Sequence, residues 1–549
     1  MIPKNYFSFL LLATSYLLLS SCKFRQKVNL IVHHATIYTI DDKFHTTEAM
    51  AVNDGKIIAI GTNDEILKQY EADEEVNASG KFIYPGFIDA HAHFVGYGQS
   101  LQKVNLVDTE SWEAVLLRCN DFAKGLQAGE WLTGRGWDQN DWTINAFPDN
   151  EKLNELFPDR PVLLKRIDGH AAIANKMALD IAGIKAGDKL TGGDIEVNEG
   201  KLTGLLVDNA IGLVASKIPA ADEGQLKAAL LLAQTNCFAT GLTSVHDCGL
   251  GYSTVKFIEK LQNSGELKMR IYAMLSDNKE NYNLAFANGK IKTDRLQMNA
   301  FKVYADGALG SRGASLLQPY SDKPDWSGFL LSTPAHFDSV ANIISQKGWQ
   351  MCTHAIGDSG NRTILNIYAK YLKGKNNMRW RIEHAQVVNE NDFHFFGDYN
   401  IIPSVQPTHA TSDMYWAEQR LGPDRVKGAY AYQQLLKENG WLPLGTDFPV
   451  EDISPFKTFF AAVTRQDAKD FPANGYQMEN ALTREQTLRG MTTWAAKAAF
   501  EEKQKGSLET GKFADFIILD SDLMKCPPAN ILKTKVLATY VNGEKVYGK

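Results

Sequence analysis

The sequence has no long run of basic residues, and its 58 Lys and Arg are outnumbered by 64 Asp and Glu, which gives a net charge of -6. Proteins that bind nucleic acid usually gather basic residues in a patch or tail, so this composition argues against a nucleic-acid partner. With 44% hydrophobic and 22% charged side chains, the chain has the composition of a globular protein. Its 549 residues suffice for one large barrel and a smaller domain.

Cysteine is scarce, and none of the six cysteines stands in a CxxC motif. Five of them follow Cys22: Cys119, Cys237, Cys248, Cys352 and Cys526. An odd set without such spacing predicts neither a disulfide framework nor a thiolate metal site.

Long apolar runs are absent after the N-terminus. The run from Phe7 to Leu19 follows Lys4 and is too short to span a bilayer comfortably, which is typical of a signal-peptide core. It ends in Leu19-Ser20-Ser21-Cys22, which resembles a bacterial lipobox. We therefore expect residues 1–22 to be a lipoprotein signal segment, and the protein to be exported and anchored to a membrane of the cell envelope through a lipidated Cys22, facing the periplasm. The alternative is an ordinary cleaved signal peptide with a chance cysteine.

Short alternating segments predict β-structure at both ends of the chain. Residues 23–82 contain runs such as Asn29 to Ile40, separated by turn signals such as Asn53-Asp54-Gly55, which is typical of antiparallel strands. Residues 506–549 repeat this pattern, with a hairpin turn at Asn542-Gly543. Packing the two ends together is the simplest way to bury both half-sheets. We therefore expect one small β-sandwich domain formed by the two chain ends.

Between the ends, residues 83–505 alternate short β-rich runs with amphipathic stretches, the pattern of a parallel α/β barrel. The expected strands are Phe87 to His91, Thr243 to Asp247, Arg270 to Leu275, Phe301 to Tyr304, Gln350 to His354, Trp380 to His384, Ile402 to Gln406 and Leu442 to Gly445. The expected helices are Ser253 to Gln262, Asp338 to Gln346, Thr363 to Tyr371 and Ala431 to Asn439. The predicted fold class is α/β, a (β/α)8 TIM-type barrel with a long insertion at about 96–240, after the first barrel strand.

Two histidines stand two residues apart at the end of the first expected strand, in the motif Pro85-Gly86-Phe87-Ile88-Asp89-Ala90-His91-Ala92-His93. Side chains at i and i+2 point to the same side of a strand, so His91 and His93 can both reach one metal ion. Taken alone the pair is weak, because two histidines on a strand can also be hydrogen-bonding surface residues.

Further potential ligands stand near the ends of other expected strands: Lys302, His354, His384 and Asp447. In barrels of this type the catalytic groups come from the carboxyl ends of several strands. Any one of these residues could instead be a core histidine or an ion-paired lysine. The complete set predicts a metal centre at that end of the barrel.

In these residues and the motifs around them, the chain resembles the amidohydrolase superfamily, and more narrowly the branch of the YtcJ-like proteins and N-substituted formamide deformylases. The resemblance covers nearly everything after the signal segment. It rests on the motifs PGFIDAHAH (85–93), GLTSVHD (241–247), KVYADGALGSR (302–312), THAIGD (353–358), RIEHAQ (381–386), SVQPTHATSDM (404–414), GTDFPVE (445–451) and GSLETGKFADFIILD (506–520).

The resemblance implies two divalent metal ions, with zinc as the expected metal. His91, His93 and Asp447 would bind one ion, and His354 and His384 the other. Lys302 would bridge them as a carboxylated lysine, because carbon dioxide converts a neutral amine into an anionic carbamate with two oxygens. The ions would share a hydroxide, and Asp447 would take its proton during attack and return that proton to the departing amine.

The substrate is not indicated by these motifs. His170 is a candidate catalytic donor to the substrate carbonyl, or else a loop histidine bonded to backbone. The candidates for substrate binding are Trp137, Asp138, Asp306, Arg312, His409 and Asp413. Arg312 would suit a substrate carboxylate, which an arginine can bind through two parallel hydrogen bonds. The chain has Asn175-Lys176 where relatives more often have Asn-Ser, which weakens any analogy with a known substrate.

The predicted function is therefore metal-dependent hydrolysis of an amide-type C–N bond in a small molecule. Ester or lactone hydrolysis and deamination are alternatives on the same barrel. Deaminases of the superfamily typically use one metal ion and a glutamate three residues after the third histidine, but Gly357 stands there. A non-catalytic binding lipoprotein should have lost ligands, whereas this set is complete. The oligomeric state stays open, a homo-oligomer included.

Overall fold

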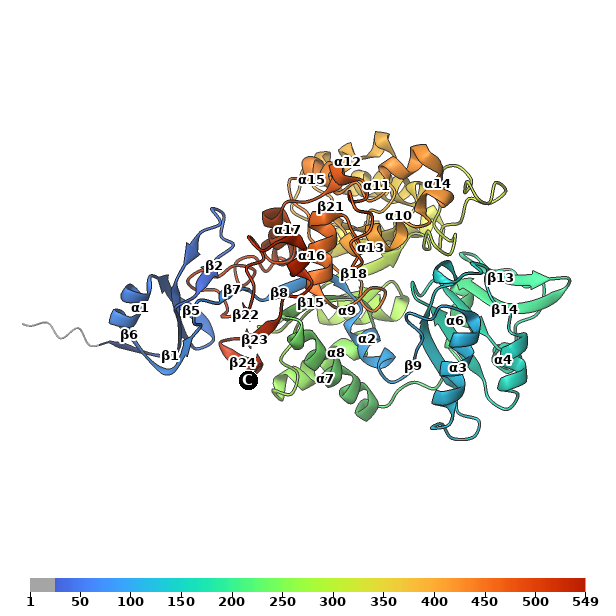
Figure 1. The fold of residues 1–549 in the computed structure, drawn as a ribbon. Coiled ribbons are helices and arrows are strands. Elements are labelled where there is room, and N and C mark those ends of the chain that lie inside the picture. The colour runs from blue at the N-terminus through green and yellow to red at the C-terminus, as the bar shows by residue number, and fades with distance from the viewer. Residues whose placement is uncertain (1–24, 549) are drawn as a thin grey trace, which may run out of the picture.

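A computed structural model describes residues 25–548 of the chain (Figure 1). The expected signal segment and the expected lipidation site at Cys22 lie outside the described residues. A central barrel separates two further parts: the sheets formed by the chain ends lie on one side, and the insertion lies on the other (Figure 1). In the part of the chain that the structure describes, no helix has the length and apolar character needed to cross a membrane.

The barrel is a nearly closed sheet of parallel strands. Its order is β21-β20-β19-β18-β16-β15-β8, with the short β17 (Ile291–Lys292) pairing antiparallel to β18. The strands are β8 (Phe87–Ala92), β15 (Leu242–Leu250), β16 (Arg270–Ser276), β18 (Leu296–Tyr304), β19 (Gln350–Ala355), β20 (Arg381–His384) and β21 (Ile402–Ser404). All are buried along most of their length, as expected for a parallel sheet covered on both faces.

The eighth expected strand, Leu442 to Gly445, closes the barrel without forming a regular strand. Val405 donates to Pro443 O at 3.2 Å, and Ala90 donates to Leu444 O at 3.0 Å, so the segment bonds to both neighbours. Its pairing on the β21 side is limited to one isolated parallel bridge, between Val405, the residue after β21, and Leu444. Pro443 has no N–H to donate, which shortens the ladder.

The helices that follow the strands cover the outside of the barrel (Figure 1). Four of them occur where the sequence predicts helices: α8 (Tyr252–Asn263), α10 (Pro334–Lys347), α11 (Asp358–Leu372) and α15 (Tyr432–Asn439). Helix α10 shows why the local sequence is helical. Thr333 caps it by accepting from His336 N, proline occupies its first position, and Gly348 ends it with a left-handed backbone.

The insertion between β8 and β15 forms a six-stranded sheet with its own apolar clusters. The sheet order is β13-β14-β12-β11-β10-β9. Its strands are β9 (Val104–Asn105), β10 (Leu132–Trp137), β11 (Val162–Arg166), β12 (Ala171–Ala174), β13 (Gly193–Asn198) and β14 (Lys201–Asp208). Helix α3 (Trp112–Ala123) contacts β9 and β10, and α5 (Lys176–Ala182) and α6 (Asn209–Ala215) contact β11 and β14 respectively.

The chain ends form two further sheets, with orders β5-β4-β1-β6 and β24-β23-β22-β7-β2-β3. The first contains β1 (Gln26–His33), β4 (Ala49–Asn53), β5 (Lys56–Gly61) and β6 (Tyr70–Asn77), and the second β2 (Thr36–Tyr38), β3 (Thr46–Thr47), β7 (Phe82–Pro85), β22 (Phe516–Leu519), β23 (Val536–Val541) and β24 (Glu544–Tyr547). Strand β22 pairs antiparallel with β7, and apolar residues from both ends of the chain, such as Val32 and Phe516, share one buried cluster.

The strands near the N-terminus are not all antiparallel, which corrects the expectation from the sequence. Strand β6 runs parallel to β1, and β7 runs parallel to β2. A parallel return needs a crossover, which helix α1 (Asn63–Gln69) supplies between β5 and β6. Thr62 and Glu65 form a capping box at the start of this helix, a helix signal that is already present in the sequence.

Candidate metal centre

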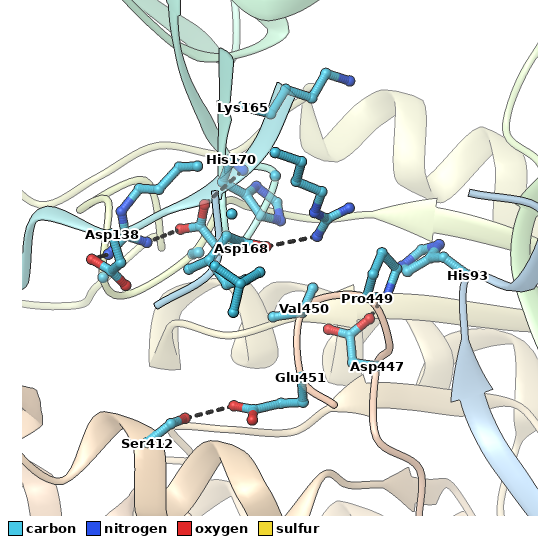
Figure 2. Close-up of a pocket in the computed structure, with 18 of the residues that line it drawn as sticks. His93, Asp138, Lys165, Asp168, His170, Ser412, Asp447, Pro449, Val450 and Glu451 are labelled. Carbon is cyan, nitrogen blue, oxygen red and sulfur yellow. Dashed lines mark hydrogen bonds and ion pairs between the residues drawn. The ribbon is translucent and has the colours of Figure 1, made fainter. Parts of the chain in front are cut away.

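A cavity of about 1040 Å³ lies over the carboxyl ends of the barrel strands. The insertion forms one wall, and the loop that follows the eighth barrel segment forms the facing wall. Figure 2 shows Lys165, Asp168 and His170 on the first wall and Asp447 and Glu451 on the second. The cavity is therefore built where (β/α)8 barrels generally place their active sites.

His91, His93 and Asp447 form the first group of potential ligands. Asp447 Oδ1 lies 3.2 Å from His93 Nε2 and 3.5 Å from His91 Nε2. The three ligand atoms lie within 4.8 Å of one another, the spacing of groups that can share one ion. The buried Asp447 Oδ1 has no hydrogen-bond donor in the structure, although Asp447 sits in the middle of the site. A buried carboxylate oxygen left this way needs a partner, which a cation provides.

A second group joins Asp447 to His384 and His409, whose ligand atoms also lie within 4.8 Å of one another. His409 Nε2, 3.7 Å from Asp447 Oδ2, is buried without a hydrogen bond. The His354 ring lies against this group, 4.5 Å from the His384 ring between centroids. Of the two ligands predicted on this side, the structure places His384 in the group, together with His409, whereas among the described residues His354 lies beside it and in neither of the two groups.

The rings of His91, His93 and His384 are each oriented by a hydrogen bond from the nitrogen that faces away from the centre. Nδ1 of His91 lies 2.6 Å from Glu383 Oε2, and Nδ1 of His384 lies 2.7 Å from Gln406 Oε1. Nδ1 of His93 donates to the backbone carbonyl of Cys248 at 2.9 Å. Each bond leaves the Nε2 lone pair directed at the centre, as outer partners of metal-binding histidines do.

Burial favours the uncharged form of His91, His354 and His384, which is the form that binds a metal ion. Desolvation, with a smaller contribution from Lys302, lowers the pKa of His91 to about 4. Desolvation also holds the pKa of His354 and of His384 well below the usual histidine value, helped by neighbouring positive groups. The chemistry of the donor set therefore fits a divalent cation of the zinc type.

Lys302 is the remaining expected ligand, and it is fully buried at the end of β18. Its Nζ lies 3.1 Å from His91 Nε2 and 4.9 Å from the centre of the Tyr304 ring. Among the described residues, no carboxylate oxygen lies within 4.0 Å of this Nζ. Lys302 is thus a buried amine beside a potential metal ligand and without a carboxylate contact of its own, a position that normally has to be compensated.

Two of the potential ligands, His384 and Asp447, have backbone conformations that residues other than glycine rarely adopt. φ is +74° at His384 and +63° at Asp447. Such conformations cost about 1–3 kcal/mol each and are found chiefly where function requires them. Both residues stand at the carboxyl ends of barrel segments, where the strained backbone turns the side chain toward the centre.

Glu383 was not among the residues predicted from the sequence, although it stands beside His384 in the RIEHAQ motif. Because it contacts His91 Nδ1, its replacement tests the site directly. We expect Glu383→Gln to lower metal affinity by roughly 10–100-fold, because the neutral amide accepts a weaker hydrogen bond from His91. Competition with a chelator of known affinity measures this change. The exposed Glu390 lies just after the same strand, and Glu390→Gln is the matched control. Equal affinity in the two variants would show that Glu383 does not support the site.

The insertion brings His170 to the cavity, held by a carboxylate from the same insertion. His170 Nδ1 lies 2.5 Å from Asp208 Oδ1, and its ring lies 5.0 Å from that of His354. Burial lowers the pKa of His170, but the Asp208 and Asp168 carboxylates outweigh that effect and raise it above the usual value. His170 is therefore a ring that can donate a hydrogen bond into the cavity.

Three of the residues predicted to bind substrate line the cavity: Asp138, Asp413 and His409. Asp138 pairs with Arg166, which also binds Asp168 at 2.6 Å. Asp413 accepts a hydrogen bond from Tyr430, and burial raises the pKa of Asp413 to about 7. The third, His409, belongs to the second ligand group.

Three other candidates for substrate binding do not line the cavity, contrary to the prediction from the sequence. Trp137 lies in the core of the insertion, and its indole donates to Leu164 O. Asp306 is fully buried beneath the site, where it accepts from backbone N–H groups including that of Gly357. Arg312 turns toward the surface and pairs with Asp322 at 2.8 Å.

Comparisons with known proteins identify the family of the chain. A model of the amidohydrolase family matches residues 74–547. The putative amidohydrolase YtcJ of Bacillus subtilis is 30% identical over 528 residues, which cover 94% of this chain and 99% of that protein. The N-substituted formamide deformylase of Arthrobacter pascens is 25% identical, over 94% of this chain and 98% of that protein. The crystal structure of an uncharacterized metal-dependent hydrolase from Pyrococcus horikoshii has a TM-score of 0.75 at 26% identity, covering 91% of this chain and 99% of that one. The chain therefore belongs to the amidohydrolase family, in the branch that the sequence motifs predicted.

Proposed function

We propose that this protein hydrolyses an amide-type C–N bond of a small molecule with the help of two divalent metal ions, zinc being the expected metal. The observation that carries the proposal is the convergence of histidines on a buried carboxylate, Asp447, next to a buried lysine without an ion-pair partner, Lys302, whose Nζ lies 3.1 Å from His91 Nε2. A fold that only binds a ligand has no need for such a set.

The proposed ligands are those that the family resemblance implies, and the convergence of His91, His93 and His384 on Asp447 supports them. His91, His93 and Asp447 would hold one ion, and His354 and His384 the second, with Lys302 between them as a carbamate. His409 is close enough to take part on the second side. When bound, the ions lower the pKa of a water molecule toward neutrality and polarise the scissile carbonyl.

The remaining chemistry falls to side chains of this chain. Asp447, which faces His91, His93 and His409, would accept the proton of the attacking water and pass it to the nitrogen of the departing amine. His170 would donate a hydrogen bond to the carbonyl oxygen as negative charge develops there. Asp208 orients that ring and favours its charged form.

Deamination is less compatible with this site. A deaminase of this superfamily would carry a glutamate at position 357. A Cβ atom at Gly357 would lie only 2.0 Å from the backbone oxygen of Ser315, so no side chain fits there without moving the backbone. Ester or lactone hydrolysis needs the same groups and is separated from amide hydrolysis by assay.

The test is to load the purified protein with zinc, manganese or cobalt, count the bound ions, and assay N-formyl, N-acyl and cyclic amides beside esters, lactones and aminopurines. We include N-formyl amides because one relative is a formamide deformylase. We expect two ions per chain and turnover of amides. One ion with turnover of aminopurines would favour deamination, and bound ions without any turnover would favour a binding protein.

We also propose that the chain is exported and anchored through Cys22. Because the lipid would be attached to this thiol, Cys22→Ala should move the protein from the membrane fraction to the soluble fraction of the cell envelope without changing its specific activity. Cys526→Ala keeps the proposed lipidation site and serves as the control. Unchanged fractionation of Cys22→Ala would contradict the anchor.

A further inference from the structure

We infer that the substrate carries an anionic group, a carboxylate or a phosphate, and that Lys103, Arg135 and Lys165 bind it on the insertion wall of the cavity. This inference rests on the proposed function, because it names the class of amide that the site would hydrolyse. All three side chains line the same cavity as Asp447. They form a basic wall that the proposed chemistry does not otherwise use.

The basic wall is a product of strand register. Arg135 on β10 lies directly across from Lys165 on β11, so the two side chains share one face of the sheet. Lys103 directly precedes β9, which pairs with β10 on its other side. Two neighbouring strands and the residue before a third thus each bring one cation to the wall of the cavity. Figure 2 shows Lys165 on this wall, above the loop that carries Asp447.

These cations lack the acidic partners that other cavity cations have. Arg166 is held between Asp138 and Asp168, and Lys457 lies 2.9 Å from Asp452. No carboxylate oxygen of the described residues lies within 4.0 Å of the charged nitrogens of Lys103, Arg135 or Lys165.

Leaving the three cations together has an energetic cost. Like charges directly opposite one another destabilise a sheet. Burial, together with repulsion from Lys103 and Arg135, lowers the pKa of Lys165 to about 8. A sheet selected for stability alone would place an acidic residue here, so an anion from outside the chain is the missing partner.

Arg135 is the best-placed of the three groups. Its Nη2 donates to Ile167 O at 2.6 Å, which holds the guanidinium in position, while its buried Nε has no partner. Burial lowers the pKa of Arg135, and the carboxylate of Asp447 is the largest of the effects that oppose this. The guanidinium is thus within electrostatic range of the metal centre, and its planar fork matches a carboxylate or phosphate.

The position of the basic wall suits binding of a group remote from the scissile bond of the substrate. Arg135 and Lys165 come from the insertion, whereas the metal ligands come from the barrel. An amide bound with its carbonyl at the barrel ligands therefore presents its far end to the basic wall. Arg312, which the sequence suggested for a carboxylate, is already paired with Asp322 and faces away.

The first arm of the experiment uses the metal-loaded protein and matched amide pairs. Within each pair, one member carries a carboxylate or a phosphate monoester and the other carries the uncharged carboxamide or hydroxyl. We expect the anionic member to have a kcat/KM at least about tenfold higher, which is the scale of one charge-assisted hydrogen bond. Comparison of the carboxylate pair with the phosphate pair identifies the natural anion.

The variants are Lys165→Gln and Arg135→Gln, with Lys201→Gln as the matched control. Lys201 is an exposed lysine on β14 of the same insertion sheet and does not line the cavity. We expect the ratio of kcat/KM between the anionic and neutral members to fall about tenfold in each of the first two variants. The ratio in Lys201→Gln should equal that of the unmodified protein.

The second arm does not depend on turnover. Calorimetric titration of the metal-loaded proteins with succinate and with succinamide should show a tenfold loss of succinate affinity in Lys165→Gln, with the metal content unchanged. Absence of amide hydrolysis, combined with this loss, would reject the proposed function and keep the anion site. Amide hydrolysis without preference for the anionic members, and with equal succinate affinity in all variants, would overturn the anion site and keep the proposed function.

Discussion

Lys302→Ala should lose at least one metal ion per chain and lower turnover by more than about a hundredfold. This exceeds the loss expected when only a hydrogen-bond partner of a ligand is changed. Without the proposed carbamate, the second ion would keep only its histidine ligands. Short carboxylic acids should restore part of the activity, because acetate or propionate can enter the vacated space and offer two oxygens to the ions. Methylamine should not restore activity. Metal analysis and turnover with and without added acid measure these effects.

The electrostatics of Lys302 indicate why the proposed carboxylation would depend on bound ions. Burial lowers the pKa of Lys302, but the nearby Cys248, Tyr304 and Glu383 groups outweigh this and hold it above the usual lysine value. Divalent cations held by the facing histidines would act in the opposite direction and favour the neutral amine, the form that can add carbon dioxide. Carboxylation should therefore accompany metal loading, which carbon-13 labelled bicarbonate would reveal by NMR.

The control for this variant is Lys292→Ala, an exposed lysine on β17, the strand that pairs with β18. It should retain both ions and normal turnover. If Lys302→Ala also retains both ions and near-normal turnover, the binuclear carbamate centre is wrong. A site with one ion on His91, His93 and Asp447 would then be the better description.

Asp447→Asn should fail in a different way, with a loss of turnover of about 10²–10⁴-fold, the contribution of a positioned general base. The amide cannot accept the proton of the attacking water. Asparagine tolerates the left-handed backbone of this position, so the fold should be kept. Much of the bound metal should also stay, because the histidine ligands remain.

Turnover and metal content of Asp447→Asn are compared with those of Asp424→Asn, a change on an exposed part of the surface. Loss of both ions together with turnover would mean that Asp447 acts mainly as a ligand. Full turnover would move the proton transfer to another group of the cavity, with His170 as the first residue to examine.

The barrel strands could be predicted because each one is marked by a short stretch of the sequence. Buried parallel strands are short apolar runs, and the potential ligands stand at their carboxyl ends, so both the strands and the position of His354 and His384 could be predicted from the sequence. Glu383 could not be predicted in the same way. Its role depends on a contact with His91, which lies far away in the sequence and is reached only when the barrel closes.

Trp137 shows why the residues that line the substrate cavity were harder to predict from the sequence. It stands two residues after Arg135 on β10, so simple alternation would place both side chains on the cavity side. The register with β11 shifts between these two residues, and Gly136 has a φ of +118°. This bulge turns Trp137 into the core of the insertion while Arg135 keeps facing the cavity. The sequence contains the glycine, but periodicity alone does not reveal its effect.

The pairing of β7 with β22 has a consequence for how the chain reaches its native state. Strand β7 is made early in synthesis, and its partner near the other end is made late. Until β22 arrives, β7 has an edge with unpaired N–H and C=O groups that another chain can occupy. Ring closure over so much intervening chain is slow, because the entropy of the loop is lost before the contact forms. Refolding from denaturant should therefore end with docking of the C-terminal strands, and its yield should fall as protein concentration rises.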